Sequence, residues 1–495
     1  MSNFTNKILF VIVDNYKTER PGVQILSSIA LQEGYERDIL IINSLSVEAN
    51  LKRVLDFKPQ IVAYSGMTYE HTILQEFNRL LKTQSGISFL SIFGGPHYTF
   101  NPEEIFNDNG IDIVCRGEGE VAFRSFIQAL RDNLEYRRID KLWVRDGDEV
   151  IKNPIGLLIH DMDTVPFMDR DLIPLDDLAT DHFQGKSLLC MIGRGCPHKC
   201  TYCFNLEYNT LFGDSRIYRH RSVDNIIEEL KQLVKRFDLD IFLFLDDCFS
   251  YLPRTFIEEF SRRYKEEINK PFSAQFRPEL VREDTIVMLK DAGLYLVPIG
   301  VECGNETVAN NILQRGRITN QHIINAFDML HKHKLKTWSL NLLALPVEDP
   351  LSIDIETIKL NMRLKPYWAQ FNILVPIPKT PIWDYIVKNG YIDEKSYLKF
   401  DKLPSGFTET KLVFKNRRVA DRVTNLHKFA GIVVKFPFLL PLVRALILLP
   451  PNRIYQYIFF LWYGYWKTIG TYNAPFSFKL IVNGLRAIRQ YLKRH

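Results

Sequence analysis

The sequence predicts an α/β protein with two parallel β-sheets and a mainly helical C-terminal region. Residues 1–135 and residues 187–400 each alternate short apolar runs with stretches of helical periodicity. Apolar strands that alternate with helices are typical of parallel sheets covered on both faces. A chain of 495 residues is also too long for one hydrophobic core, so two or three domains are expected.

The first region is predicted to be a doubly wound, flavodoxin-like sheet. Its strands are expected at residues 7–13, 37–43, 60–66, 88–95 and 111–115, with helices between them and a last helix over 121–132. Sheets of this kind bind ligands at the carboxyl ends of their strands. The residues expected there are Asp14, Ser65, Gly66, Thr68, Gly94, Gly95, Gly117, Glu118, Gly119 and Glu120.

Small residues at these strand ends would allow a bulky ligand to approach the backbone closely. The alternative is that the glycines only turn the chain. Four such loops at one sheet edge favour a ligand site, and the lack of a G-x-G-x-x-G motif argues against a dinucleotide.

Residues 136–186 are predicted to be a connector with a hairpin at 142–151, where Asp146-Gly147 gives a turn signal. The second alternation begins at Ser187. Its six strands are expected at 187–193, 241–247, 271–277, 296–302, 337–345 and 370–376, with helices between them. Six strand–helix units indicate a partial (β/α)6 barrel, whose chemistry would lie at the carboxyl ends of its strands.

Three cysteines follow the first of these strands with the spacing C-x3-C-x2-C: Cys196, Cys200 and Cys203. Structural zinc takes four ligands, usually from two separated pairs, and no second pair follows at that spacing, although His198 could serve as a fourth ligand. An iron–sulfur cube fits better, because three thiolates leave one iron open to a non-protein ligand. Cys115, Cys190, Cys248 and Cys303 are interpreted as ordinary buried cysteines.

The cysteine spacing, with aromatic Tyr202 before the last cysteine, resembles that of the radical S-adenosylmethionine (SAM) enzymes. This resemblance implies a [4Fe-4S] cluster on Cys196, Cys200 and Cys203. Its open iron would bind the amino and carboxylate groups of SAM, and reduction would yield a 5′-deoxyadenosyl radical.

Other segments resemble the cobalamin-dependent branch of that family, which implies cobalamin as a further cofactor. They are "GGPHYTF" (94–100), "DIVCRGEGE" (112–120), "FLDDCF" (244–249), "GVECGNE" (300–306), "LQRG" (313–316) and "VPIPKTP" (375–381). One departure concerns the D-x-H-x-x-G motif, whose histidine ligates cobalt in many cobalamin proteins. Asp14 is present here, but Tyr16 and Glu19 replace the histidine and glycine, so a protein imidazole on cobalt is not expected.

Polar residues on the predicted barrel strands are candidate contacts for SAM or substrate. Asp246 and Asp247 end the second strand, although Asp247 could equally be a helix N-cap. Gln275 and Arg277 alternate with Phe276, which places both on one face of the third strand. Glu302 ends the fourth strand, and Asn341 lies on the fifth. Structural hydrogen bonding is an alternative for all of them.

Residues 401–495 are predicted to form a helical, aromatic-rich region. No uncharged run within 435–467 reaches the length of about 18 residues that a membrane span needs. Aromatic residues beside Lys and Arg are nevertheless typical of interfacial segments. We expect either a helical cap on the barrel or contact with a membrane surface or a lipid-like substrate, and the two are compatible.

The resemblance predicts an enzyme that methylates an unactivated carbon, with [4Fe-4S], SAM and cobalamin as cofactors and flavodoxin or ferredoxin as electron donor. Alternatives are radical cyclisation, ring contraction or oxidation with the same cofactors, or a non-catalytic cobalamin or metal sensor. A formal net charge of +5 does not indicate nucleic acid as a partner. No secretory signal is recognisable at the first residues, so a cytoplasmic protein is expected, with peripheral membrane contact as an option.

Overall fold

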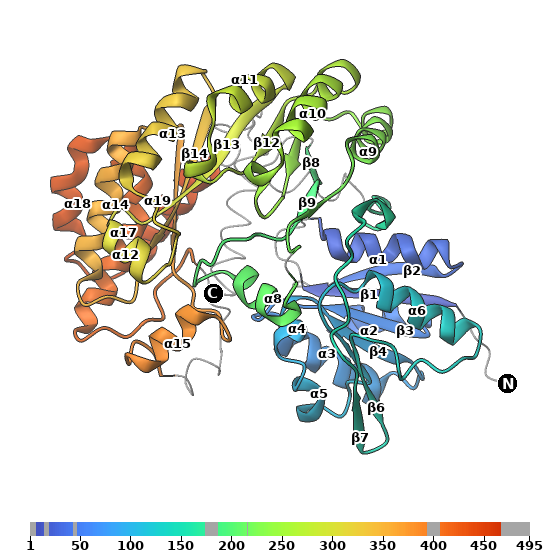
Figure 1. Cartoon of the computed structure of the whole chain (residues 1–495). Helices are drawn as coiled ribbons and strands as arrows, with labels where there is room; N and C mark the ends of the chain where they lie inside the picture. The colour runs from blue at the N-terminus through green and yellow to red at the C-terminus, as the bar shows by residue number, and fades with distance from the viewer. Residues whose placement is uncertain are drawn as a thin grey trace. The chain divides into compact units, whose positions relative to one another are not determined.

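The computed structural model describes residues 6–13, 19–42, 47–173, 187–214, 216–393 and 406–466 (Figure 1). The chain divides into two compact units. The first comprises Met1–Asp181 with Thr210–Asp214, and the second comprises His182–Asn209 with Ser215–His495. Asp14 lies outside the described residues, as do 174–186 and 467–495.

The first unit contains a sheet in the order β2-β1-β3-β4-β5-β6-β7. Its first five strands are parallel: β1 (Lys7–Val13), β2 (Glu36–Ile42), β3 (Ile61–Ser65), β4 (Leu90–Gly94) and β5 (Ile113–Cys115). The helices are α1 (Pro21–Gln32), α2 (Val47–Phe57), α3 (His71–Gln84), α4 (Pro96–Phe100), α5 (Glu104–Asn107) and α6 (Glu120–Arg131). The strand order reverses between β1 and β3, which is where such sheets bind ligands.

Helices cover both faces of this sheet, as predicted. Val11 of β1 belongs to a buried cluster with Phe77 and Leu81 of α3. Phe10 points to the opposite face and contacts Phe123 of α6, with ring centroids 6.1 Å apart. Because all residues of β1 after Lys7 are buried, the strand has no polar alternation in its sequence.

The predicted hairpin is present and extends the sheet. β6 (Leu142–Asp146) pairs with β5 and with β7 (Glu149–Lys152), in both cases antiparallel. The chain then returns across the first unit, where Asp169 accepts hydrogen bonds from Ser27 (2.6 Å) and Arg37 (2.8 Å). The first unit therefore continues past residue 135, the boundary expected from sequence.

The second unit contains a six-stranded parallel sheet in the order β15-β14-β13-β12-β11-β8. The strands are β8 (Ser187–Cys190), β11 (Ile241–Phe244), β12 (Phe272–Ala274), β13 (Leu294–Glu302), β14 (Lys336–Leu343) and β15 (Trp368–Ile373). The helices between them are α9 (Val223–Arg236), α10 (Arg254–Glu267), α11 (Glu283–Ala292), α12 (Glu306–Asn311), α13 (Asn320–Lys332) and α14 (Pro350–Leu364). Neighbours in sequence are neighbours in the sheet, which confirms the (β/α)6 arrangement.

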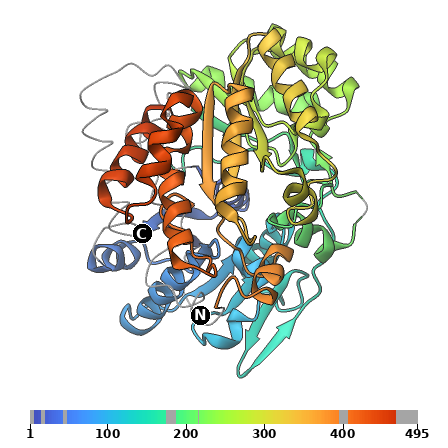
Figure 2. The same cartoon turned by 90° about the vertical axis from the view of Figure 1, so that its left-hand side faces the viewer.

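After β15 comes α15 (Pro381–Lys388), and the described part of the C-terminal region is helical, as predicted: α17 (Arg417–Lys435), α18 (Leu440–Leu446) and α19 (Arg453–Tyr465). α17 lies beside β15 and α14 (Figure 2), and Leu426 and Val433 of α17 share a buried cluster with Phe371 of β15. Trp466 is buried at the end of α19. No helix of the described residues is both long enough and apolar enough to cross a bilayer.

Candidate functional site

The loop that carries the three cysteines begins after β9 (Gly193–Arg194), which pairs antiparallel with β10 (Arg219–His220). Gly195 has φ of +89°, and a Cβ on it would lie 2.2 Å from the Ile217 carbonyl oxygen. Only glycine fits this position without displacing the backbone. The close approach to Ile217 therefore fixes the backbone at the start of the loop.

Hydrogen bonds from other elements hold the loop along its length. The Gly195 amide donates to Asp247 (2.9 Å), and the Asn209 side-chain amide donates to the Cys196 carbonyl (2.8 Å). The Thr201 hydroxyl donates to the Ile312 carbonyl (2.6 Å), and the Thr201 amide donates to Leu313 (3.1 Å). The cysteines are thus presented on a supported backbone.

The three cysteines are sequestered from water. Cys196 and Cys200 are buried and Cys203 is half-buried. Burial raises the pKa of the Cys203 thiol to about 11, and a hydrogen bond with Cys248 together with burial raises the pKa of Cys196. Such thiols become thiolates when a metal offsets the cost of charging them.

The donor set is informative about the metal. Three cysteines of one loop could each bind one iron of a [4Fe-4S] cluster and leave the fourth iron open to another ligand. Structural zinc usually takes four ligands from two separated pairs. The donor set fits a [4Fe-4S] cluster.

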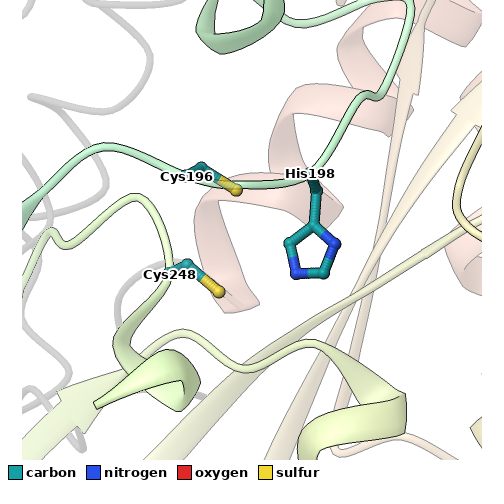
Figure 3. A group of neighbouring side chains, drawn as sticks. All are labelled: Cys196, His198 and Cys248. Atoms are coloured by element: carbon teal, nitrogen blue, oxygen red, sulfur yellow. The ribbon is translucent and has the colours of Figure 1, made fainter. Parts of the chain in front are cut away.

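A second group of ligand atoms does lie within 4.8 Å: Cys196, His198 and Cys248 (Figure 3). Cys248 follows β11 and is buried beside Cys196, whereas the sequence suggested an ordinary core cysteine. The sequence feature that could have indicated this role is the position of Cys248 directly after Asp246-Asp247, at the end of a predicted barrel strand. The structure thus adds a fourth thiol next to the predicted cluster ligands.

Arg277 contacts the site from the loop after β12. Its Nη1 lies 3.5 Å from the Cys200 sulfur, and its Nε donates to Glu279 over 2.6 Å. Its backbone amide donates to the Ser250 hydroxyl (3.2 Å), which lies 3.7 Å from the Cys248 sulfur. Gln275 is exposed, while Phe276 between them is buried, as the predicted alternation requires.

Glu302 lies at a break in the register between β13 and β14, at Gly300–Glu302, and has φ of +60°. Bulges of this kind re-aim side chains and are common beside active sites. Glu302 accepts a hydrogen bond from Tyr202 of the cysteine loop. Burial raises the pKa of Glu302, and the positive charge of Arg315 opposes that increase.

The two aspartates after β11 support the backbone of the cysteine loop. Asp246 is buried, and one of its carboxylate oxygens accepts hydrogen bonds from the amides of Ile192 (3.1 Å) and Gly193. Burial raises the pKa of Asp246 to about 7. Asp247 accepts from Gly195 and from Asn205 (3.1 Å). These hydrogen bonds are structural, but the second carboxylate oxygen of Asp246 is buried without a partner among the described residues, so its contact with SAM or substrate stays a prediction.

Asn341 does not face the barrel interior, which corrects the expectation that it contacts a cofactor. Its amide donates to the Gln370 carbonyl (2.9 Å), and its oxygen accepts from Asn361 of α14 (2.7 Å). β14 alternates buried and half-buried residues, so the half-buried Leu340 and Leu342 point to the opposite face. The expectation was wrong because the sequence of β14 does not show which of its two faces packs against the covering helices.

The first unit brings four of the predicted ligand residues together at the ends of β3 and β4. The Gly66 amide donates to the Gly94 carbonyl (3.1 Å), and a Cβ on Gly95 would lie 3.2 Å from the Ser65 hydroxyl. Gly95 has φ of +93°. Thr68, after β3, is buried, and its hydroxyl has no hydrogen-bond partner in the described residues.

The fourth predicted loop, 117–120, leads from β5 into α6. Gly117 has φ of +71°, and its amide donates to the Thr99 hydroxyl (3.0 Å). Glu118 is buried and accepts from the Ile159 amide (2.9 Å). Gly119 is the N-cap of α6, and Glu120 is its buried first residue.

These strand ends suit a ligand with many amide groups, such as cobalamin. Buried polar atoms without partners are rare in folded proteins and call for a ligand or water. Besides Thr68, both ring nitrogens of the buried His97 lack a hydrogen bond within the described residues. Glycine-lined strand ends beside the topological switch point, with buried polar atoms that lack partners among the described residues, therefore fit the cofactor.

Comparisons with known proteins agree with both cofactor assignments. Residues 190–354 match the family described as the radical SAM superfamily, and residues 9–127 match the B12 binding domain. The B12 match covers the parallel strands β1 to β5, and the radical SAM match runs from the end of β8 through β14.

Curated relatives are similar to this chain over much of its length. An uncharacterized methyltransferase from Pyrococcus horikoshii is 28% identical over 77% of this chain and 81% of the relative. An anaerobic magnesium-protoporphyrin IX monomethyl ester cyclase from Cereibacter sphaeroides is 21% identical over 68% of this chain and 55% of the relative. The solved structure of OxsB, a cobalamin-dependent SAM radical enzyme with aqua-cobalamin bound, shares the fold, with a TM-score of 0.68 at 14% identity, covering 98% of this chain and 80% of OxsB.

The fold and site define a radical SAM enzyme with an N-terminal cobalamin domain. The chain belongs to the cobalamin-dependent radical SAM enzymes, and its cofactors are a [4Fe-4S] cluster, SAM and cobalamin.

Proposed function

We propose that this enzyme transfers a methyl group to an unactivated carbon of a small-molecule or lipid-like substrate. The observation that carries the proposal is the pairing, in one chain, of the cysteine loop after β8 with a cobalamin-binding sheet. The relationship to a protein described as a methyltransferase supports the reaction type.

When bound, the cluster and SAM supply a 5′-deoxyadenosyl radical that removes a hydrogen atom, and cobalamin supplies the methyl group. Cys196, Cys200 and Cys203 would hold three irons and leave the fourth for SAM. Each turnover consumes two SAM: one leaves as S-adenosylhomocysteine and the other as 5′-deoxyadenosine and methionine. Two electrons come from an external donor, for which flavodoxin or ferredoxin is suitable.

The chain's residues would bind and orient the reactants. Arg277 donates to the Cys200 sulfur and fixes that ligand. Glu302, held by Tyr202 beside the cysteine loop, would accept a hydrogen bond from the amine or ribose of SAM. At the other sheet, Ser65, Gly66, Thr68, Gly94 and Gly95 would contact cobalamin, and the loop 117–120 would close that edge.

The barrel interior supports a substrate with an apolar carbon skeleton. The β14 side chains opposite the buried Asn341 network are Trp338, Leu340 and Leu342. Trp338 stacks on Trp368 of β15, with ring centroids 4.4 Å apart. These side chains would pack against such a substrate, and Gln370 and Asn372, which pair with Leu340 and Leu342 across the sheet, would offer it hydrogen bonds.

Radical ring closure without methyl transfer is the second candidate, since a relative is described as a cyclase. The test is incubation of the anaerobically reconstituted enzyme with cobalamin, a reductant and methyl-deuterated SAM. Methyl transfer predicts S-adenosylhomocysteine that depends on added cobalamin, and a product that is heavier by a deuterated methyl group. Production of 5′-deoxyadenosine without S-adenosylhomocysteine would favour ring closure, and the absence of both would favour a non-catalytic sensor.

A further inference from the structure

The C-terminal helices expose an unusual amount of apolar surface. Nine large hydrophobic side chains are exposed between residues 436 and 465, whereas thirteen others are spread from Leu31 to Val413. The nine are Phe436, Phe438, Leu442, Leu448, Leu449, Ile454, Tyr457, Leu461 and Tyr465. A concentration of exposed large apolar side chains in one short segment is typical of an interaction site. We call these nine residues the apolar surface.

On α19 the apolar surface is one continuous helical face. Ile454 (69% exposed), Tyr457 and Leu461 (54%) recur at helical spacing, and Tyr465 continues the row. The opposite face is apolar too, but it is buried: Phe459, for example, contacts His427 of α17 with ring centroids 4.6 Å apart. α19 is thus apolar all round while covered on one side only.

The tryptophans Trp462 and Trp466, although part of the aromatic-rich segment, do not belong to this surface. Trp466 is buried and contacts Tyr367, with centroids 5.4 Å apart. Trp462 is half-buried against Gly431. The C-terminal helices therefore cover the sheet, in agreement with the helical cap that was one of the two interpretations of the sequence. The exposed face consists of Leu, Ile, Phe and Tyr.

The charge around the apolar surface has a single sign. From Arg422 to the C-terminus the sequence contains no Asp or Glu. The basic residues of this stretch that the structure describes are Arg422, Lys428, Lys435, Arg444 and Arg453, of which Lys428 is buried. Lys435, Arg444 and Arg453 are exposed within or beside the apolar surface. Basic residues near a bilayer surface each favour anionic lipid by about 1 kcal/mol.

We propose that the apolar surface binds the interface of an anionic lipid bilayer. A second protein copy would have to bury this face against the same uncompensated positive charge, whereas anionic headgroups neutralise that charge. Helices of 7 and 13 residues suit lying in an interface and are too short to span a bilayer. The proposal does not depend on the identity of the enzyme's substrate.

The test is flotation of the full-length protein with vesicles of phosphatidylcholine containing phosphatidylglycerol. We expect binding at low salt that weakens as salt rises, and weaker binding to phosphatidylcholine alone. Ile454→Asp/Leu461→Asp should reduce partitioning about tenfold or more, because two apolar anchors are lost. Leu157→Asp, at a residue 82% exposed in the other unit, is the matched control and should bind as the unaltered protein does.

Absence of the full-length protein from anionic vesicles at low salt would overturn the proposal. Equal loss of binding in the Leu157→Asp control would also overturn it. A dimer that Ile454→Asp/Leu461→Asp converts to monomer, with no vesicle binding, would assign the surface to self-association instead. Circular dichroism and SAM binding of both variants show whether they are folded.

Discussion

Cys248 lies beside the predicted cluster ligand Cys196. Through Ser250 and Arg277 it is also connected to a second predicted ligand, Cys200. Cys248 hydrogen-bonds Cys196 and lies 3.7 Å from the Ser250 hydroxyl, while Arg277 joins Ser250 to the Cys200 sulfur. Hydrogen bonds to cluster sulfurs are a means by which proteins set cluster reduction potentials. Neither contact requires Cys248 or Arg277 to bind iron.

Replacing Cys248 should therefore change the reduction potential of the cluster and leave its iron content intact. As an iron ligand Cys196 would be a thiolate, so the Cys248 thiol would donate to it; Cys248→Ala removes that donor, and the midpoint potential should become more negative. Cys248→Ser keeps a hydroxyl donor and should restore most of the difference. Redox titration followed by electron paramagnetic resonance measures this, with Cys115→Ala as the control buried thiol. Loss of iron in both Cys248 variants would mean that Cys248 is itself a ligand.

Individual site residues could be predicted only where their spacing in the sequence determines which way their side chains point. The compact cysteine motif and the alternation of Gln275 and Arg277 about Phe276 could be read from sequence. The role of Asp246, by contrast, depends on backbone amides more than fifty residues away. The prediction for Asn341 was wrong for a similar reason, because its hydrogen-bond partner Asn361 lies in the next helix, α14.

At the scale of elements, the cysteine loop depends on the β9–β10 ribbon for its direction. Gly195→Ala would push a Cβ against the Ile217 carbonyl, in a backbone conformation unfavourable for alanine. Such overpacking costs about 1–3 kcal/mol. We expect a lower midpoint of urea unfolding and reduced iron incorporation.

Gly22→Ala is the matched control for this change. Gly22 lies in the first turn of α1, and nothing lies within 4 Å of its added Cβ. This variant should unfold and bind iron as the unaltered protein does. If Gly195→Ala behaved in the same way, the geometry assigned to the loop would be incorrect.

The elements themselves were largely predictable, because buried parallel strands and amphipathic helices leave strong periodic signals. All six barrel strands and the helices α9, α10, α11, α13 and α14 occur where periodicity places them. The register break beside Glu302 was not predictable, since it depends on how β13 pairs with β14. Similarly, nothing in residues 142–151 showed that the hairpin would join the first sheet.

At the scale of the whole molecule, two parallel sheets supply two cofactor sites and the C-terminal helices cover the edge strand β15. The fold class could be predicted because each sheet has its own alternation. The sequence could not show which faces of the C-terminal helices would be covered, because α19 is apolar on every side.

The cobalamin domain yields a prediction about cobalt. Tyr16 stands where a cobalt-ligating histidine is found in many cobalamin proteins, and His97 is buried beside His71, with ring centroids 4.1 Å apart. The full-length protein should bind cobalamin, and the cob(II)alamin form should show no nitrogen superhyperfine splitting from a protein histidine. His97→Ala should leave the spectrum unchanged. Splitting that disappears in this variant would identify His97 as the ligand.

Cleavage of SAM by the reconstituted full-length enzyme tests the central claim most directly. Under anaerobic reduction, the protein should hold about four irons at the cysteine loop and release 5′-deoxyadenosine. Cys200→Ala should lose both the cluster and the product, whereas Cys115→Ala, which changes a buried cysteine of the other unit, should keep both. One zinc per chain, with 5′-deoxyadenosine absent or unaffected by Cys200→Ala, would contradict the assignment of this chain as a radical SAM enzyme.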